Sequence, residues 1–431
     1  MSDPLLRALN RAAPSREAAK RHSKPMTVLS HGLGRDSSAM TCLLIEGKLK
    51  VDGEEIGPES MTAMVFSDPG YEWSFTNGAM GVGPVPELVA LDAMRDMLAP
   101  HEIPLHVLKT PPKRLWYDWW RRRREAWLAS FGQIQRLRSQ GDARKASRLW
   151  SKLSKAVPRG ALPWQPESLM DASIEQKAEA GYYQSDIPLL ERVMERSRPI
   201  ILRRAGGVRS AECTSHHKIQ PIRHYLSDLV RREYPSIERA MNDTERNKGT
   251  VYLADRDHRG HRIRRNDPQA ALKLFAAKVD AGLLPPIRLL IGLAADETTR
   301  IERGAEGREK APEYVRIAIQ ELYPLAEAGI AKDDEIAILS RHGLNWIRKS
   351  GCVFCPEGGK PNMWALSRWH PPTYRRVVEL EKAAVRRNPR FTWFGGKKML
   401  PEVMRGWRKN NPRETVEGVL DKGYDHSVGS F

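Results

Sequence analysis

A short apolar run that leads directly into a glycine- and serine-rich turn restricts the fold of this chain more than any other feature. The run, residues 26–30, is β-prone, and residues 38–49 after the turn have the apolar spacing of a helix. Glycines in such a turn let the backbone approach an anion, while the first N–H groups and the dipole of the helix point toward it. The sequence therefore predicts a strand–turn–helix unit that binds phosphate. The alternative is an ordinary connection between a strand and a helix.

The same alternation of strand and helix recurs along the chain. Apolar runs at 62–67, 105–109 and 287–293 predict three further strands, and residues 86–99 predict a helix between two of them. Strands that alternate with helices favour a parallel sheet with helices on both faces. We therefore expect an α/β fold built on a doubly wound parallel sheet.

Changes of composition along the chain suggest how it is divided. Tryptophan and arginine crowd the segment after the third predicted strand, where Trp116, Trp120 and Trp127 recur at helical spacing and either form a core or stack on bases. A second basic stretch, 243–266, lacks a clear period and is expected to be irregular. The expected parts are a flexible basic N-terminal arm (1–25), a nucleotide-binding core in two segments (26–110 and 199–310), a basic helical insertion (111–198) and a helical C-terminal part with a Cys-x-x-Cys (311–431).

The charge of the chain points to an anionic partner. The 431 residues carry a formal net charge of +18, with a pI near 9.8, and nucleic acid is the commonest polyanion that such a charge would attract. The alternative is a basic surface that contacts only solvent. No run of about 18 apolar residues occurs, and the N-terminal residues lack the apolar core of a secretory signal. We therefore expect a cytoplasmic protein without membrane contact.

The side chains of the turn add to its phosphate-binding character. Ser30, Ser37 and Ser38 offer hydroxyl donors, and Asp36 is a candidate to bind a magnesium ion or orient a water molecule. The turn is not a Walker A motif, because the Gly-Lys-Ser/Thr ending is missing, and it is not a Gly-x-Gly-x-x-Gly motif.

Two adjacent carboxylates end the last predicted strand. Asp296 and Glu297 would lie on the same edge of a parallel sheet as the glycine-rich turn, and ligands bind at that edge. They are candidates for a magnesium ligand or a general base. The alternative is that Asp296 caps the next helix.

The turn resembles a known nucleotide-binding loop. Ser30-x-Gly32-x-Gly34-x-Asp36-Ser37-Ser38 is similar to the PP-loop of the adenine-nucleotide α-hydrolase superfamily, whose usual form is Ser-Gly-Gly-x-Asp-Ser, although this turn is one residue longer and contains His31. That superfamily includes ATP pyrophosphatases and phosphoadenosine phosphosulfate (PAPS) reductases. Later segments resemble PAPS-reductase-like proteins in the same order: Phe66-Ser-Asp68-Pro-Gly70-Tyr-Glu72, Arg209 with Cys213-Thr214 and Lys218-Ile-x-Pro221, Gly292-Leu-Ala-Ala-Asp296-Glu297 with Arg300, and Tyr323-Pro-Leu325 with Ser350-Gly-Cys352-Val-Phe-Cys355-Pro356.

The resemblance covers residues 26 to about 400 except 111–198, and implies the HUP or PP-loop form of a Rossmann-like fold with ATP and Mg²⁺ at the turn. It implies catalytic roles for Asp36, Ser37, Asp296 and Lys218. The residues expected to bind the nucleotide are Ser30, Gly32, Gly34, Asp36, Ser37, Ser38, Asp68, Gly70, Arg209 and Arg300. The expected reaction converts ATP to AMP and pyrophosphate during sulfur transfer onto a nucleic acid, tRNA or DNA, with a sulfur donor protein as a second partner.

The four cysteines are too few and too unevenly spaced for a disulfide framework. Cys42 falls on the apolar side of the first predicted helix and is expected in the core. Cys213, Cys352 and Cys355 suit a [4Fe–4S] cluster with one open iron, as in similar enzymes that sulfurate nucleic acid. With His216 they also suit a tetrahedral zinc site, and the remaining alternative is a set of unrelated thiols.

Departures from the resemblance keep other functions open. PAPS reductases carry a C-terminal Glu-Cys-Gly-Leu-His motif, whereas the tail from Asp421 to Phe431 has no cysteine. A sulfonucleotide reductase is therefore the second hypothesis. The third is a nucleic-acid-binding protein with a relict nucleotide pocket and a structural zinc.

Overall fold

The computed structural model describes residues 24–84, 86–155, 162–196, 201–203, 209–211, 213, 215–247, 249–355, 358–387, 391–394 and 397–421. The arm expected at 1–25 therefore lies outside the described residues up to residue 23, as do Thr214 and Pro356. Within the described part, no helix has the length and apolar character needed to cross a membrane.

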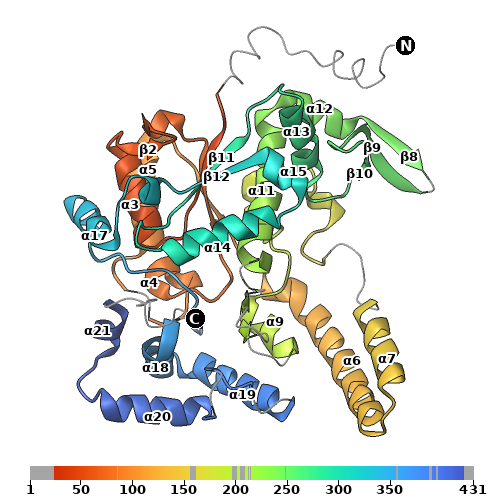
Figure 1. Ribbon diagram of the computed structural model, residues 1–431, viewed down its shortest axis with the longest axis vertical. Helices are drawn as coiled ribbons and strands as arrows, with labels where there is room; N and C mark the ends of the chain where they lie inside the picture. The colour runs from red at the N-terminus through yellow and green to blue at the C-terminus, as the bar shows by residue number, and fades with distance from the viewer. Residues whose placement is uncertain are drawn as a thin grey trace.

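Five parallel strands form the central sheet (Figure 1). Their spatial order is β12 (Ile319–Leu322), β11 (Ile287–Ile291), β1 (Thr27–Ser30), β4 (Ala63–Ser67) and β5 (Leu105–Leu108). The chain adds β4 and β5 on one side of β1 and then returns to add β11 and β12 on the other. The α/β fold and four of its strands are thereby confirmed. The fifth, β12, lies within 311–431, where only helices were expected.

Helices cover the sheet on two sides. Successive side chains of its strands point to opposite faces, and each face contributes to its own apolar cluster. Val28 and Val65 enter the first cluster, whereas Leu29 and Met64 enter the second. The first cluster includes residues of α11 (Gln220–Glu233), α12 (Pro235–Asn242), α13 (Ala270–Asp280) and α15 (Glu313–Ala318). The second includes residues of α3 (Arg35–Ile45), α5 (Ala90–Leu98) and α17 (Lys332–Arg341). Cys42 of α3 is fully buried there, as expected.

Smaller elements join the sheet to the larger units. Two antiparallel pairs are β2 (Leu49–Val51) with β3 (Glu54–Ile56) and β6 (Ile201–Arg203) with β7 (Arg209–Ala211). The further helices in this part of the chain are α4 (Ser74–Asn77), α8 (Ile174–Glu179), α9 (Leu189–Arg196), α14 (Thr298–Glu309) and α16 (Pro324–Glu327). Of these, α14 begins beside the carboxyl edge of the sheet, because only a short loop separates it from β11.

A helical hairpin projects from the sheet after β5 (Figure 1). It consists of α6 (Lys113–Ser139) and α7 (Ala143–Lys155). At its base Trp116 and Trp120 are buried in one cluster with Trp164. These tryptophans therefore form a core. The side chain of Trp127 lies outside the described residues.

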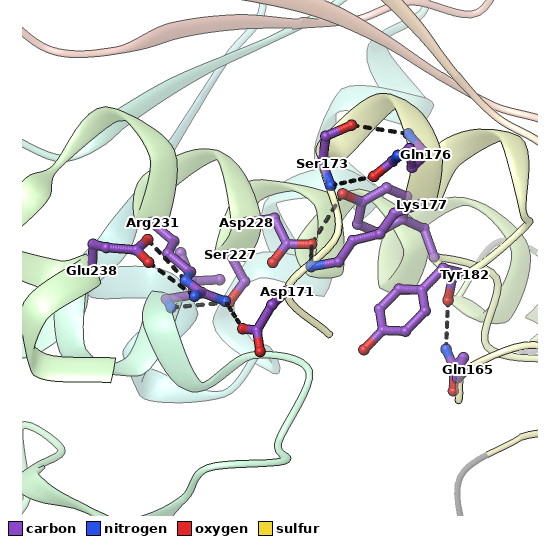
Figure 2. A network of polar contacts seen from close by, with 12 residues as sticks. Gln165, Asp171, Ser173, Gln176, Lys177, Tyr182, Ser227, Asp228, Arg231 and Glu238 are labelled. Carbon is purple, nitrogen blue, oxygen red and sulfur yellow. Dashed lines mark hydrogen bonds and ion pairs between the residues drawn. The ribbon is translucent and has the colours of Figure 1, made fainter. Parts of the chain in front are cut away.

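Polar contacts fasten α8 and the residues near it to α11 (Figure 2). The buried Lys177 of α8 pairs with Asp228 of α11, with 2.8 Å between Nζ and Oδ2. Arg231, also on α11, pairs with Asp171 at 3.0 Å and with Glu238 of α12 at 2.9 Å. The segment that follows the hairpin is therefore held against the helices of the first cluster.

The basic stretch 243–266, expected to be irregular, is instead an antiparallel sheet. Its strands are β8 (Thr244–Asn247), β9 (Thr250–Arg256) and β10 (Arg262–Arg264), in the order β10-β9-β8. Leu253 and Ile263 are buried in the first cluster, while arginines occupy many neighbouring positions. With so few apolar residues, the period-2 pattern of a half-buried strand is too weak to recognise in the sequence.

The C-terminal helices pack against the chain that follows β4. They are α18 (Gly359–Trp369), α19 (Pro371–Arg387), α20 (Leu400–Asn410) and α21 (Val416–Asp421). Their apolar residues share a third cluster with Tyr71 and Trp73. Arg376 of α19 donates to the Tyr71 hydroxyl at 3.0 Å and pairs with the buried Glu191 of α9 at 2.5 Å. Apolar and polar contacts together thus tie this part to the carboxyl edge of the sheet.

Candidate functional site

The carboxyl edge of the sheet carries the residues that the sequence singled out. Ser30 ends β1, Asp68 follows β4 and Asp296 follows β11. Between β1 and β11 the direction in which strands are added reverses, and open parallel sheets form a crevice for ligands at such a point. The glycine-rich turn and the loop 292–297 flank this reversal, so the structure brings the two predicted segments together.

The turn owes its shape to a buried histidine. His31 accepts a hydrogen bond on Nδ1 from the Leu33 N–H at 2.9 Å, and its Nε2 lies 3.1 Å from the Thr41 hydroxyl. Burial lowers the pKa of His31 to about 3, so the ring is neutral at physiological pH. Leu33 has a φ of 54°, a left-handed conformation that is uncommon for leucine. His31, which interrupts the resemblance in the sequence, is therefore part of the framework of the turn.

The two adjacent serines of the turn have different environments. Ser37 Oγ accepts a hydrogen bond from the Gly32 N–H at 3.1 Å and donates to the Gly34 carbonyl at 3.2 Å. Ser38 is fully buried, and its hydroxyl has no hydrogen-bond partner among the described residues. Ser37 therefore closes the turn, while the hydroxyl of Ser38, in the first turn of α3, remains able to form a hydrogen bond.

A segment from the C-terminal part packs directly on the turn. A Cβ atom at Gly34 would lie 2.6 Å from the Ser350 nitrogen, and one at Gly32 would lie 3.3 Å from the Ser350 hydroxyl. Arg35 also donates from Nε to the Ile347 carbonyl at 3.1 Å. The glycines are therefore needed for close approach by this segment, besides any role in the approach of an anion.

Four charged side chains meet at the start of α3. Lys349 Nζ lies 2.6 Å from Glu297 Oε1, and Arg300 Nη1 lies 2.5 Å from Glu297 Oε2. The same Arg300 nitrogen is 3.9 Å from Asp36 Oδ2. Burial opposes ionisation of Glu297, but Arg300 and Lys349 lower its pKa to about 2. Two cations and two carboxylates thus share a small volume beside the turn, and the structure places Asp36 and Arg300 at one site.

A fifth ionisable group of this cluster was missed in the sequence. Glu335 of α17 is buried, and its Oε1 has no hydrogen-bond partner among the described residues. Burial raises the pKa of Glu335 to about 9, and the negative charges of Asp36 and Glu297 add to the rise. Burial also raises the pKa of Asp36, although Lys349 opposes that rise. At neutral pH the cluster therefore holds a protonated carboxyl beside the ionised Glu297.

Asp296, predicted as a reactive residue, lies at the margin of the cluster. Its side chain is 44% exposed and pairs with Lys332 at 3.2 Å. The N-cap position of α14 belongs to Glu297, so the alternative that Asp296 caps this helix is wrong. Glu297, with a side chain that is 3% exposed, makes the contacts with the cations. The geometry therefore favours Glu297 over Asp296 as the carboxylate that holds the cations beside the turn.

A second polar group follows β4. Asp68 accepts a hydrogen bond from the Gly70 N–H at 2.7 Å, and burial raises the pKa of Asp68 to about 7. Gly70 has a φ of 83°, a conformation that favours glycine. Lys218 Nζ lies 4.0 Å from the buried Glu72. Burial would lower the pKa of Lys218, but the attraction of Glu72 raises it overall. Lys218 therefore belongs with Glu72 and not with the cluster at Asp36.

The three candidate ligand cysteines lie in the neighbourhood of Lys218. Cys213, Cys352 and Cys355 are close enough to Lys218 for their thiolates to raise its pKa, and burial raises the pKa of the Cys352 thiol itself. Cys213 and Cys352 also pack against the same apolar cluster. Among the described residues, however, no three His, Cys, Asp or Glu side chains are grouped closely enough to hold a metal ion. The structure thus brings these cysteines into one neighbourhood, but the described part shows no preformed zinc or iron–sulfur site.

Two further predicted residues lie on segments beside these groups. The carbonyl of His216, in the short π-helix η5 (Ser215–Ile219), accepts a hydrogen bond from the Ser185 hydroxyl at 2.6 Å. The backbone of Arg209 is in β7, while its side chain lies outside the described residues. The ligand role of His216 and the nucleotide contact of Arg209 therefore stay predictions.

The residues that sequence reasoning missed left weak signals. Glu335 precedes Ile338 and Leu339 by three and four residues, which is the spacing of a buried helix face. Lys349 lies three residues before Cys352 and directly before Ser350, the first residue of the resembling segment.

No protein-family model, no curated protein and no solved structure shows a significant match to this chain.

Proposed function

We propose that this chain is a PP-loop enzyme of the adenine-nucleotide α-hydrolase superfamily, with the doubly wound fold of that group. It uses ATP with Mg²⁺, releases AMP and pyrophosphate, and thereby activates a nucleic acid for sulfur transfer. The observation that carries this proposal is the charged cluster of Asp36, Glu297, Arg300 and Lys349 beside the turn.

The cluster supplies what a bound polyphosphate requires. Glu297 holds Lys349 and Arg300 beside the start of α3, and both cations can transfer their hydrogen bonds to phosphate oxygens. The N–H groups of the turn add partial positive charge at the same place. Asp36, whose side chain is 14% exposed beside these cations, is the proposed ligand for Mg²⁺.

The proposed reaction has two steps. An oxygen of the acceptor attacks the α-phosphorus of ATP, the bond from that phosphorus to its bridging oxygen breaks, and pyrophosphate leaves with the electron pair. A hydrosulfide delivered by a donor then attacks the activated acceptor atom. The bond to sulfur forms, and AMP leaves with the oxygen. Lys349 and Arg300 are placed to stabilise the charge of the leaving pyrophosphate.

The thiols beside Lys218 mark the side of the site at which the proposal places the sulfur donor of the second step. Cys352 forms an isolated β-bridge with Glu72, so this thiol segment is joined to the chain that follows β4. No step is routed through zinc or a [4Fe–4S] cluster, because the described residues contain no group of three ligands. The same thiols would serve a sulfonucleotide reductase, which the following experiment separates from an ATP-dependent enzyme.

Substitution in the turn tests the proposal. Asp36→Ala and Ser37→Ala should each lower the release of AMP and pyrophosphate from ATP by about 100-fold or more, because they remove the Mg²⁺ ligand and the hydroxyl that closes the turn. Asp92 lies exposed on α5, so Asp92→Ala is a matched control that should retain turnover. Retained turnover in Asp36→Ala would contradict the proposal. Turnover of a sulfonucleotide in place of ATP would favour the reductase.

A further inference from the structure

We propose that the hairpin α6–α7 is an arm that binds the sugar–phosphate backbone of a nucleic acid. The inference rests on the proposed function and names the surface that holds its substrate. From Lys113 to Lys155 the arm carries thirteen lysine and arginine residues and three acidic residues. This excess is more than half of the chain's net charge of +18.

Many of these cations face solvent. The exposed ones include Arg114, Arg121, Arg122, Arg138, Arg144 and Arg148. Two of the acidic residues form ion pairs within the arm, Asp118 with Arg121 at 3.8 Å and Asp142 with Lys145 at 2.8 Å. Three carboxylates cannot neutralise thirteen cations, so the arm presents a surface that attracts a polyanion.

The arm has the length and the packing to follow several phosphates. The 27 residues of α6 correspond to about 40 Å at 1.5 Å per residue. Ile134 of α6 and Ala146 of α7 are buried where the two helices pack together, and Trp116 and Trp120 are buried at the base. Because successive phosphates of one strand are about 3.4 Å apart along a duplex, α6 can run beside roughly ten of them.

The arm begins at the edge of the sheet that carries the site. α6 starts five residues after Leu108, the last residue of β5. Figure 1 shows the hairpin extending from this edge on the same side as α9 and α19. A nucleic acid bound along α6 would therefore lead toward the turn and the thiols.

A basic cleft continues the arm onto the C-terminal helices. The cleft has a volume of about 190 Å³ and lies between α6 and α19, where Arg124 faces Lys382 and Arg386. Its acidic residue is Glu379, which pairs with Lys382 at 2.8 Å. The remaining lining is apolar and consists of Met194 of α9, Leu380 and Ala383. The three cations outnumber the one carboxylate, which suits a phosphate group of the backbone.

The exposed side chains in the described part of the arm suit a nucleic acid better than an anionic lipid surface. Tyr117 is the large hydrophobic side chain that stands exposed on the described part of the arm, and Lys113 lies over its ring. A helix that lies on a membrane would expose several apolar side chains along one face. An exposed tyrosine among arginines instead suits stacking on a base.

Fluorescence anisotropy without ATP tests the arm, with labelled single- and double-stranded DNA and RNA of about 20 nucleotides as probes. The full chain carrying Arg114→Gln, Arg121→Gln, Arg122→Gln and Arg144→Gln should bind at least about 30-fold more weakly at about 0.1 M salt. The slope of log affinity against log salt should fall by roughly 3. A matched control changes four exposed cations elsewhere, Lys48, Lys50, Arg95 and Lys310, to glutamine and should preserve affinity and slope.

Equal losses in the two variants, or no loss in the arm variant, would overturn the assignment. So would binding of the wild-type chain to phosphatidylserine vesicles but to none of the four probes. If the fourfold variant does not fold, the single variants Arg122→Gln and Arg144→Gln test the assignment instead. Each should weaken the binding of nucleic acid several-fold. Unchanged affinity in both would refute the assignment of the arm. Binding of Mg²⁺–ATP without nucleic acid should survive in the arm variants, whereas Asp36→Ala should lose the release of AMP and keep the binding of nucleic acid. A failure of the arm assignment can therefore be told apart from a failure of the proposed function.

Discussion

At the scale of single residues, Glu335 shows how burial makes the cluster beside the turn sensitive to pH. Its pKa is about 9 in the folded chain, compared with 4.5 for an unperturbed glutamate. The folded chain therefore keeps a proton that the unfolded chain releases at lower pH. The stability that depends on this proton is fully present below about pH 4.5 and is lost as the pH rises toward 9.

We expect Glu335→Gln, which mimics the protonated side chain, to stabilise the fold increasingly as the pH rises. The gain in unfolding free energy should grow from near zero at about pH 5 to on the order of 2 kcal/mol or more at about pH 8, with at most about 1.4 kcal/mol per pH unit. Urea unfolding at several pH values measures it. Asp333→Asn changes an exposed carboxylate of the same helix and is the control. A gain that stays flat with pH would show that Glu335 is ionised in the fold.

The sequence allowed Asp36 and Arg300 to be assigned to one site because each belongs to a segment that resembles PAPS-reductase-like proteins and follows a recognisable strand. Lys349 and Glu335 could not be found in the same way. Their importance comes from the contact of residues 330–350 with α3, and no local pattern of apolar residues or spacing encodes a contact between such distant segments. His31 was passed over because a departure from a motif gives no sign of the hydrogen bonds that it forms.

At the scale of elements, the junction of β11 with α3 depends on one glycine. A Cβ atom at Gly292 would lie 3.0 Å from the Ser37 nitrogen and 3.2 Å from Asp36 Cβ. The end of β11 can therefore reach the start of α3 only without a side chain at this position. Gly307, inside α14, is the opposite case, because a Cβ there would meet nothing within 4 Å.

Alanine at these two glycines should have opposite effects. Gly292→Ala should lower the unfolding free energy by about 1–3 kcal/mol, because backbone and side chain at the start of α3 must move. Gly307→Ala should raise it by up to about 1 kcal/mol, because alanine restricts the unfolded chain and favours a helix. Thermal or urea unfolding measures both. A stabilising effect of Gly292→Ala would refute the close approach.

The elements that could be predicted differ from the others in how they are buried. β1, β4, β5 and β11 read as apolar runs because helices cover them on both sides. β12 contains Gln320 and Glu321, so half of it is polar. Most residues of the antiparallel strands at 244–264 are polar or charged, apart from the short run 251–254 in β9. In both cases polar and charged residues interrupt the apolar pattern by which the other strands were recognised.

At the scale of the whole molecule, a polar clamp joins the C-terminal helices to the carboxyl edge of the sheet. Tyr71 donates to Glu191 at 2.7 Å, and Arg376 pairs with the same carboxylate at 2.5 Å. Arg376→Met should lower the unfolding free energy by about 1–2 kcal/mol, because it leaves a buried carboxylate without its cation. Hydrogen exchange at residues 71–75 and in α19 should become faster. Arg375→Met, at an exposed position of α19, is the control, and equal exchange in both variants would mean that apolar packing alone holds these helices.

Ser350 packs on Gly34, although more than three hundred residues of chain lie between these two parts of the site. During translation the N-terminal part leaves the ribosome first and can begin to fold. The turn and α3 would then form while residues 347–352 are still unmade. A nascent chain that stalls before this segment would carry the glycine-rich turn with neither Lys349 nor the Cys-x-x-Cys beside it. The order of synthesis thus keeps an unfinished chain from assembling the charges and thiols that the proposed chemistry needs.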